Sequence, residues 1–122
     1  MAFLNDSVFD SGLAYATTNG TKIDICTTEP ATYAGIAAVT LGNDTVVAGA
    51  PAAGSPTGRG VTVPAITAGT VTGTNTASFW ALSDGASILV ATGSITTPQA
   101  VTSGNTFTLD AIALTITDAT SV

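Results

Sequence analysis

Two patterns of apolar and polar residues divide the chain near residue 20. In the first part Phe9, Leu13 and Ala16 recur at helical spacing, and the dipeptide Asn19-Gly20 supplies a left-handed stop. From Thr21 onward, short apolar runs alternate with polar residues at the period of two that is typical of β-strands. The pattern predicts a short helix over 7–18 followed by β-structure.

The start of the expected helix carries a capping signal. Ser7 fits the N-cap and Asp10 the third helical position, from which its carboxylate reaches back to a free amide. Asp6 is the alternative cap, one residue earlier. Asp6 and Asp10 are also four residues apart, a spacing at which two carboxylates can share a cation, but capping is the plainer interpretation.

The segment 21–48 is expected to form strands. In 22–26 the alternation places Ile23 and Ile25 inward and the side chains between and beside them outward, so Cys26 is expected to be a small, semi-exposed packing residue. After Glu29-Pro30 the pattern is ambiguous, and a turn of helix followed by a strand fits the stretch up to Leu41.

A turn followed by a short strand is expected next. Gly42-Asn43-Asp44 has the composition of a turn, and Thr45–Ala48 that of a strand.

Residues 49–60 contain four Gly and two Pro and predict no regular structure. The segment is expected to be a long loop or arm, either mobile or docked on a neighbour. If it were a linker, it would leave two parts too small to be stable alone, so a single domain over 1–122 is the better interpretation.

The remaining chain, 61–118, predicts further strands. The expected strands are Val61–Ile66, Thr70–Gly73, Thr76–Leu82, Ser87–Thr92, Thr106–Leu109 and Ile112–Thr117. Apolar residues are odd-numbered in the fifth of these strands and even-numbered in the sixth, so a bulge or kink is expected near Asp110-Ala111.

Asp84-Gly85 predicts a β-hairpin with a two-residue turn. That register places Trp80 opposite Leu89, with Leu82 on the same face, and places Phe79 on the other face. Both faces are then apolar, so each needs a cover: a second sheet on one side, and the N-terminal helix, the arm or another subunit on the other.

Many Thr and Val residues, few helix formers and a turn signal every 8–12 residues predict the fold class. We expect an all-β protein, an antiparallel β-sandwich or partly open barrel with a short N-terminal helix and a long Gly/Pro-rich arm.

Charge and composition exclude several classes of function. With two cations against eight acids, the net charge of −6 argues against nucleic-acid binding. The absence of His and the single Cys remove disulfide frameworks, thiolate zinc sites and His-based catalysis. No cofactor and no metal site are expected.

No catalytic motif emerges from the spacing of the remaining residues. Gly58-Arg59-Gly60 lacks the lysine and hydroxyl of a phosphate-binding loop, and the serines have no base beside them. Asn43-Asp44 and Ser83-Asp84 are acidic enough to suit Ca²⁺, but turn formation explains both pairs. Paired carboxylates could still meet in space as in glycosidases, yet the eight acids are scattered. We expect a protein that is not an enzyme.

Only 8% of the residues are charged, mean hydropathy is +0.49, and 45% of the residues are hydrophobic. So little charge leaves few groups to solvate the exterior, which predicts that other chains cover part of it, as in a homo-oligomer. No apolar run approaches the roughly 20 residues of a spanning helix, so no membrane partner is expected. The start of the chain lacks the basic and apolar regions of a secretory signal, so synthesis in a cytoplasm is expected.

Several segments resemble a family of small structural proteins of tailed-bacteriophage virions. They are Ala2–Leu13, Thr21–Cys26, Glu29–Tyr33, Trp80–Gly85 and Gly104–Phe107. The resemblance covers most of the chain apart from the arm and includes no catalytic motif. It implies a virion component, namely a capsid decoration (cement) protein that binds the major capsid protein or other virion proteins and stabilises the head.

The expected contact surface joins the arm to the hairpin. Its residues are Arg59, Pro51, Pro56, Trp80, Leu82 and Leu89. Arg59 is suited to pair with a carboxylate of a neighbour, and the hairpin face supplies the apolar centre. Alternatively, the arm folds over Trp80 within one subunit.

Two other functions stay open. One is another small head or tail accessory, associated with a fibre base or a connector. The other is a carbohydrate-binding β-sandwich module with Trp80 or Tyr33 as the stacking platform.

Overall fold

The computed structural model describes residues 5–53 and 58–116, and most of them are in strands. The elements are α1 (Asp6–Asn19), β1 (Lys22–Cys26), α2 (Tyr33–Val39), β2 (Thr40–Thr45), β3 (Ala52–Ala53), β4 (Arg59–Val63), β5 (Ile66–Val71), β6 (Asn75–Ser83), β7 (Leu89–Val101), β8 (Thr106–Leu109) and β9 (Ile112–Ile116).

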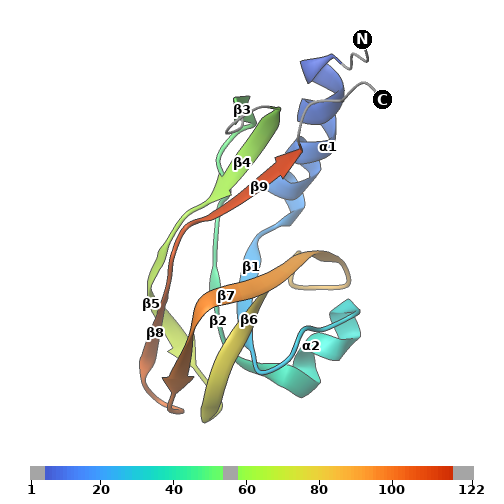
Figure 1. Cartoon of the computed structure of the whole chain (residues 1–122). Helices are drawn as coiled ribbons and strands as arrows, with labels where there is room; N and C mark the ends of the chain where they lie inside the picture. Colours follow the sequence, from blue (N-terminus) through green and yellow to red (C-terminus); the bar gives the residue numbers. More distant parts are fainter. Residues whose placement is uncertain (1–4, 54–57, 117–122) are drawn as a thin grey trace, which may run out of the picture.

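The strands form two antiparallel sheets. Six strands in the order β7-β6-β1-β2-β5-β8 curl into a half-barrel, and β3-β4-β9 form a small second sheet (Figure 1). The small sheet and α1 form one end of the molecule, and α2 lies at the half-barrel (Figure 1). The expected all-β fold with an open barrel and an N-terminal helix is confirmed.

A kinked pair of strands connects the two sheets. β4 pairs with β9 in the small sheet, and the adjoining segments β5 and β8 pair in the half-barrel. Burial changes phase at the kink: Phe107 and Leu109 are buried before it, whereas the partly buried residues after it are Ile112 and Leu114. The break expected near Asp110-Ala111 is confirmed, and it lets one strand serve both sheets.

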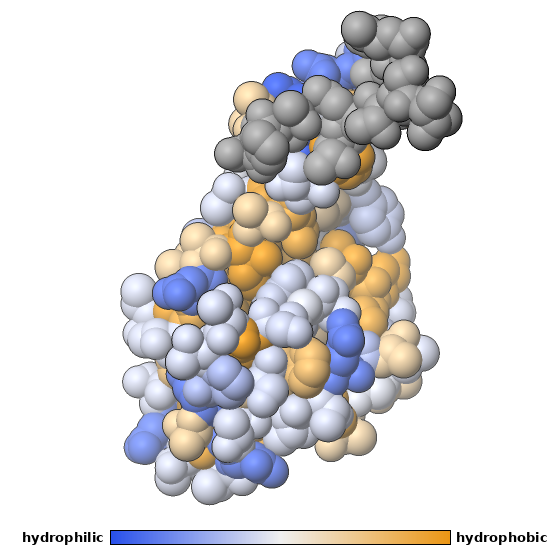
Figure 2. All heavy atoms as spheres, viewed as in Figure 1, coloured by the Kyte–Doolittle hydropathy of each residue, from blue (hydrophilic) through white to orange (hydrophobic). Residues whose placement is uncertain are grey.

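The main core lies on the concave side of the half-barrel. Ile23 and Ile25 of β1 face Leu82 and Trp80 of β6 across the sheet, and Phe107 of β8 joins the same cluster. On the face seen in Figure 2, apolar residues gather toward the end with α1 and the small sheet, and the opposite end is mostly polar. Burial of the core side chains of β1, β6 and β8 is the main favourable contribution to folding.

Helix α1 begins one residue earlier than expected because its cap is different. Asn5 is the N-cap, and its side chain accepts a hydrogen bond of 2.8 Å from the Ser7 amide. The prediction of Ser7 or Asp6 as cap is wrong, and Asp10 does not reach back to the helix start but pairs with Arg59. Gly20 does end the helix, with φ −82° rather than the left-handed conformation.

Both faces of β1 are buried, which corrects the expected alternation. Ile23 and Ile25 point into the barrel, but Asp24 and Cys26 are also buried, at 2% and 0% exposure. Helix α2 packs Ile36 against Cys26, so the ambiguous stretch before Leu41 supplies the cover that the sequence assigned to other segments. Desolvation raises the pKa of the Cys26 thiol to about 12, which keeps it an inert packing residue.

The expected turn at Gly42-Asn43-Asp44 is wrong, because these residues lie inside β2. Each of them pairs with a residue of β1, and Gly42 also packs against the backbone of Thr70. β2 ends at Thr45, so most of the strand predicted over Thr45–Ala48 is irregular backbone. The polar residues of the segment are accommodated because Asp44 is only half-buried.

The arm is partly regular, which corrects the expectation for 49–60. Ala52 and Ala53 of β3 pair with Gly60 and Arg59 of β4, so both ends of the segment belong to the small sheet. Pro51 is half-buried, whereas Pro56 lies outside the described residues.

The β6–β7 hairpin exists, but its two-residue turn is wrong. The Asp84 carboxylate accepts hydrogen bonds from the amides of Ala86, Ser87 and Ile88 and thereby organises a five-residue loop over 84–88. Gly85 adopts φ +75° within it. These three bonds hold the pKa of Asp84 below its usual range.

The longer loop moves the register of the hairpin. Ser83 pairs with Leu89, so Trp80 lies opposite Gly93 and not opposite Leu89. β7 also continues to Val101, well beyond the strand predicted to end at Thr92. Pro98 is tolerated because β7 is an edge strand of the half-barrel.

Candidate functional site

The residues predicted to form one contact surface lie in three places: the barrel core, the opposite face of the large sheet, and the small sheet with Arg59. Trp80 and Leu82 point into the barrel core, at 8% and 0% exposure. Leu89 lies on the opposite face of the sheet, against the cluster of Ile36 and Cys26. The shared face of Trp80, Leu82 and Leu89 is therefore wrong, because it depended on the two-residue turn. The role of each residue in contacts with other molecules stays a prediction.

Arg59 finds its carboxylate partner within the same chain. Its Nε and Nη2 donate to the two carboxylate oxygens of Asp10, at 2.8 and 3.1 Å. This hydrogen-bonded pair lowers the pKa of Asp10 and raises that of Arg59. The pair joins α1 to β4, so Arg59 supports the fold at the position where a contact with a neighbour was expected.

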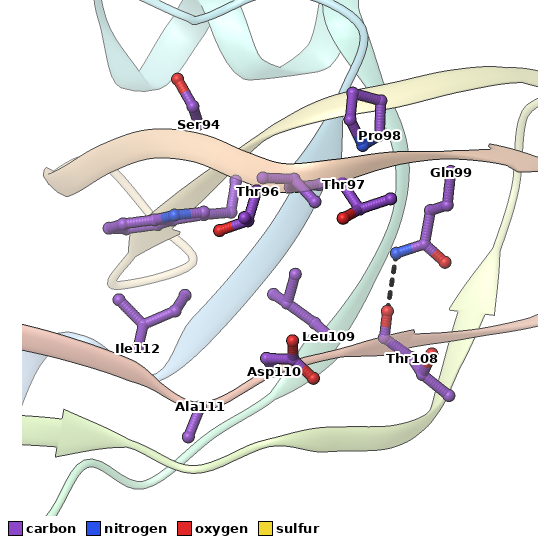
Figure 3. A pocket seen from close by; sticks show the side chains of 12 residues that line it. Ser94, Thr96, Thr97, Pro98, Gln99, Thr108, Leu109, Asp110, Ala111 and Ile112 are labelled. Atoms are coloured by element: carbon purple, nitrogen blue, oxygen red, sulfur yellow. Dashed lines mark hydrogen bonds between the residues drawn. The ribbon is translucent and has the colours of Figure 1, made fainter.

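A hollow of about 410 Å³ lies between the two edges of the half-barrel, where β7 passes the β8–β9 kink. Figure 3 shows Thr96, Thr97, Leu109 and Ile112 in the space between the two ribbons. Gln99 spans it, since its side-chain amide donates to the Thr108 carbonyl at 2.7 Å (Figure 3). The hollow arises because four residues of β7, 95–98, bulge away opposite a single residue of β6.

Trp80 lines this hollow but is held against β7. A Cβ built on Gly93 would lie 2.6 Å from the indole ring, so only glycine lets the ring lie this close to the strand. With 8% of its surface exposed, Trp80 is part of the core and a poor stacking platform.

A second hollow of about 230 Å³ lies beside α2, and a buried carboxylate forms part of its wall. Thr40 donates to Asp24 Oδ2 at 2.8 Å, while Oδ1 has no hydrogen-bond partner among the described residues. Lys22 Nζ is 4.0 Å from Oδ1. Asn43 and Tyr33 complete the polar lining, and desolvation raises the pKa of Asp24.

Helix α1 exposes apolar side chains as well as burying them. Phe9 and Leu13 are buried, whereas Val8 and Tyr15 are 54% and 49% exposed. Val8 and Tyr15 are seven residues apart and so share one face of the helix, two turns from each other. Ile116 of β9 is 38% exposed and its Cδ1 comes within 3.9 Å of a Cβ built on Gly12, between them on the helix. We call Val8, Tyr15 and Ile116 the α1 patch.

Neither hollow has the composition of a metal centre. Within 5–53 and 58–116, no three His, Cys, Asp or Glu residues come close enough to hold a metal ion. None of the helices in the described part of the chain is long and apolar enough to cross a membrane.

Comparisons with known proteins return no relative. No protein-family model, no curated protein and no solved structure matches the chain.

Sequence reasoning missed the two features that the geometry brings forward. Asp24 and Asn43 lie opposite each other in β1 and β2, but the predicted turn at 42–44 concealed this pairing. Val8 and Tyr15 carried a usable signal, since an apolar pair seven residues apart lies outside the buried stripe of Phe9, Leu13 and Ala16.

Proposed function

We propose that this chain is a non-enzymatic structural protein of a tailed-bacteriophage virion, a capsid decoration protein that binds the major capsid protein and associates with copies of itself. The family resemblance of the segments at 2–13, 21–26 and 80–85 supports the proposal. The low content of charged residues supports it too, because a chain with 8% charged residues has few groups to solvate its exterior.

The α1 patch is the observation that carries the proposal. A surface helix of a soluble monomer normally has polar residues opposite its buried stripe. On α1, Ser7, Ser11 and Thr18 take that place, but Val8 and Tyr15 are exposed beside the stripe, on the side of Ile116. The charged residues of α1 are Asp6 and Asp10, of which Asp10 is paired with Arg59. Exposed apolar groups drawn from a helix and the adjacent strand β9 are typical of a surface that another chain covers.

The edges of the half-barrel are less suited to assembly than α1. β7 is long, but Pro98 and the bulge at 95–98 interrupt its edge. β8, at the other edge, has only four residues. Short strands, prolines and bulges are the features by which proteins prevent edge-to-edge pairing. The proposed contact is therefore side-chain packing on α1 and not addition of a strand.

The proposal is tested by mixing the purified chain with expanded empty capsids of the phage whose structural genes encode it. We expect saturable, stoichiometric binding, and electron microscopy should place the chain at symmetry-related sites with α1 toward the capsid surface. Binding confined to the portal, neck or tail would instead support the accessory role. A chain that binds none of these particles would overturn the proposal.

A further inference from the structure

We propose that the hollow beside α2 binds one unit of a carbohydrate, with Asp24 Oδ1 accepting hydrogen bonds from its hydroxyls. This inference is independent of the proposed virion role. Among the described residues, Asp24 Oδ1 has no hydrogen-bond partner, although its side chain is only 2% exposed. Such oxygens normally have a donor, and leaving one unpaired destabilises the fold.

The strands fix a second polar group beside that oxygen. Asp24 and Asn43 are directly paired residues of β1 and β2, so their side chains leave the same face of the sheet next to each other. Asn43 is half-buried and offers both an amide donor and a carbonyl acceptor. Two neighbouring hydroxyls on a sugar ring present the same alternation of donor and acceptor.

The charges in the hollow favour a neutral ligand. Lys22 and Asp24 carry opposite charges and lie 4.0 Å apart at their closest atoms, so the site has no net charge. An ammonium ion would be repelled by Lys22, and an anion by Asp24. A hydroxyl group can bind to both side chains, since it donates to the Asp24 carboxylate and accepts from the Lys22 ammonium group.

Size and the apolar wall agree with a sugar ring. The hollow measures about 230 Å³, and a cavity of about 150 Å³ is enough to hold benzene. Tyr33 and Ile36 supply an aromatic and an aliphatic surface next to the polar groups. Tyr33 is half-buried at the start of α2, which leaves part of its side chain accessible to the C–H face of a ring.

The test is an NMR titration of the isotopically labelled chain with glucose, galactose, mannose and N-acetylglucosamine, each added separately. We expect at least one sugar to cause saturable amide shifts in β1, α2 and at Asn43, with a Kd on the order of 1 mM. Asp24→Asn and Asn43→Ala should each weaken that binding about tenfold or more. Asp110→Asn, which alters a carboxylate at the other hollow, is the matched control and should bind as the parent does.

Three outcomes would overturn the inference. One is the absence of saturable shifts with every sugar at about 100 times the expected Kd. Another is binding that persists unchanged in the folded Asn43→Ala variant. The third is saturable binding of n-butylammonium in place of the sugars, which would make the hollow a cation site. In the first case, the space beside Asp24 holds water only.

Discussion

The two helices cover sheet faces in opposite ways. α1 packs three buried residues, Phe9, Leu13 and Ala16, and leaves Val8 and Tyr15 exposed beside them. α2 is half as long, buries only Ile36, and its exposed side chains are small alanines. Beneath α1, Leu13 and Ala16 make an apolar contact with Val61, whereas the hollow beside α2 includes the buried carboxylate of Asp24. The difference is that α1 exposes apolar side chains, on which the proposed contact with another chain depends, whereas α2 borders a polar hollow.

The largest expected effects come from the buried anchor of each helix. Leu13→Ala and Ile36→Ala should each lower the free energy of unfolding by about 2–5 kcal/mol, because each leaves a cavity. The two variants should differ in how far the affected helix itself is loosened. α1 keeps Phe9 and Ala16 in place, but α2 loses its single buried residue.

Denaturant unfolding measures the free energy of unfolding, and amide hydrogen exchange measures how readily each helix opens locally. In Ile36→Ala, the amides of α2 should exchange through local opening, with β6 still protected. Equal exchange of both helices in the two variants would contradict the difference in anchoring.

The N-caps give a matched pair of smaller effects. Asn5 accepts from the Ser7 amide at 2.8 Å, and Thr32 accepts from the Gly35 amide at 3.1 Å. Replacing either residue by Ala should cost about 0.5–2 kcal/mol. A thermal melt of each variant checks this. Ser7→Ala is the control, because the structure does not use Ser7 as a cap, and a loss in that variant as large as in Asn5→Ala would restore the rejected assignment.

The pH dependence of stability should separate Asp24 from Asp84. Desolvation raises the pKa of Asp24 above its ordinary 3.8, so ionisation costs stability as pH rises from 3.8 through the raised value. Asp24→Asn should therefore be at least as stable as the parent at pH 7, and lose that advantage below pH 3.8.

Asp84 should behave with the opposite sign. Its pKa is lowered by three backbone amides, so its contribution is complete above the ordinary 3.8 and is lost as pH falls through the lowered value. Asp84→Asn should be less stable at pH 7 and equal to the parent in strong acid. Chemical denaturation across pH tests both variants, and the same sign in the two would refute the difference in environment.

The smallest expected effect concerns the Arg59–Asp10 pair. Arg59→Lys should lower the melting temperature slightly, because an ammonium group cannot reproduce the two parallel hydrogen bonds of the guanidinium. The difference in melting temperature between Arg59→Lys and the parent should shrink in about 1 M salt, where the Debye length is about 3 Å. A deficit that is independent of salt would indicate lost packing of the side-chain stem instead.

The sequence predicted the fold wherever a local pattern and the tertiary environment agree. The spacing of Phe9, Leu13 and Ala16 located α1, and the change of phase after Leu109 located the kink. Both signals arise from burial of one face, which a single sequence records.

It failed where a polar side chain determines the backbone. Asp84 binds three amides and makes a loop in place of a tight turn, and nothing in the dipeptide Asp84-Gly85 distinguishes these outcomes. Because of that single difference, Trp80 lies opposite Gly93, and Leu89 does not share a face with Trp80 and Leu82 as predicted. The hollow beside α2 was missed for a similar reason, because β2 includes residues with the composition of a turn.

Binding to expanded empty capsids tests the central claim most directly when the parent chain is compared with a double variant, Val8→Asp with Tyr15→Asp. Ala14→Asp is the control, because Ala14 is also exposed on α1 but lies outside the patch. Co-sedimentation should show saturable binding of the parent and of Ala14→Asp, and affinity reduced at least about tenfold in the double variant, because two buried charges would lie in an apolar contact. A folded double variant that binds as tightly as the parent would contradict the account.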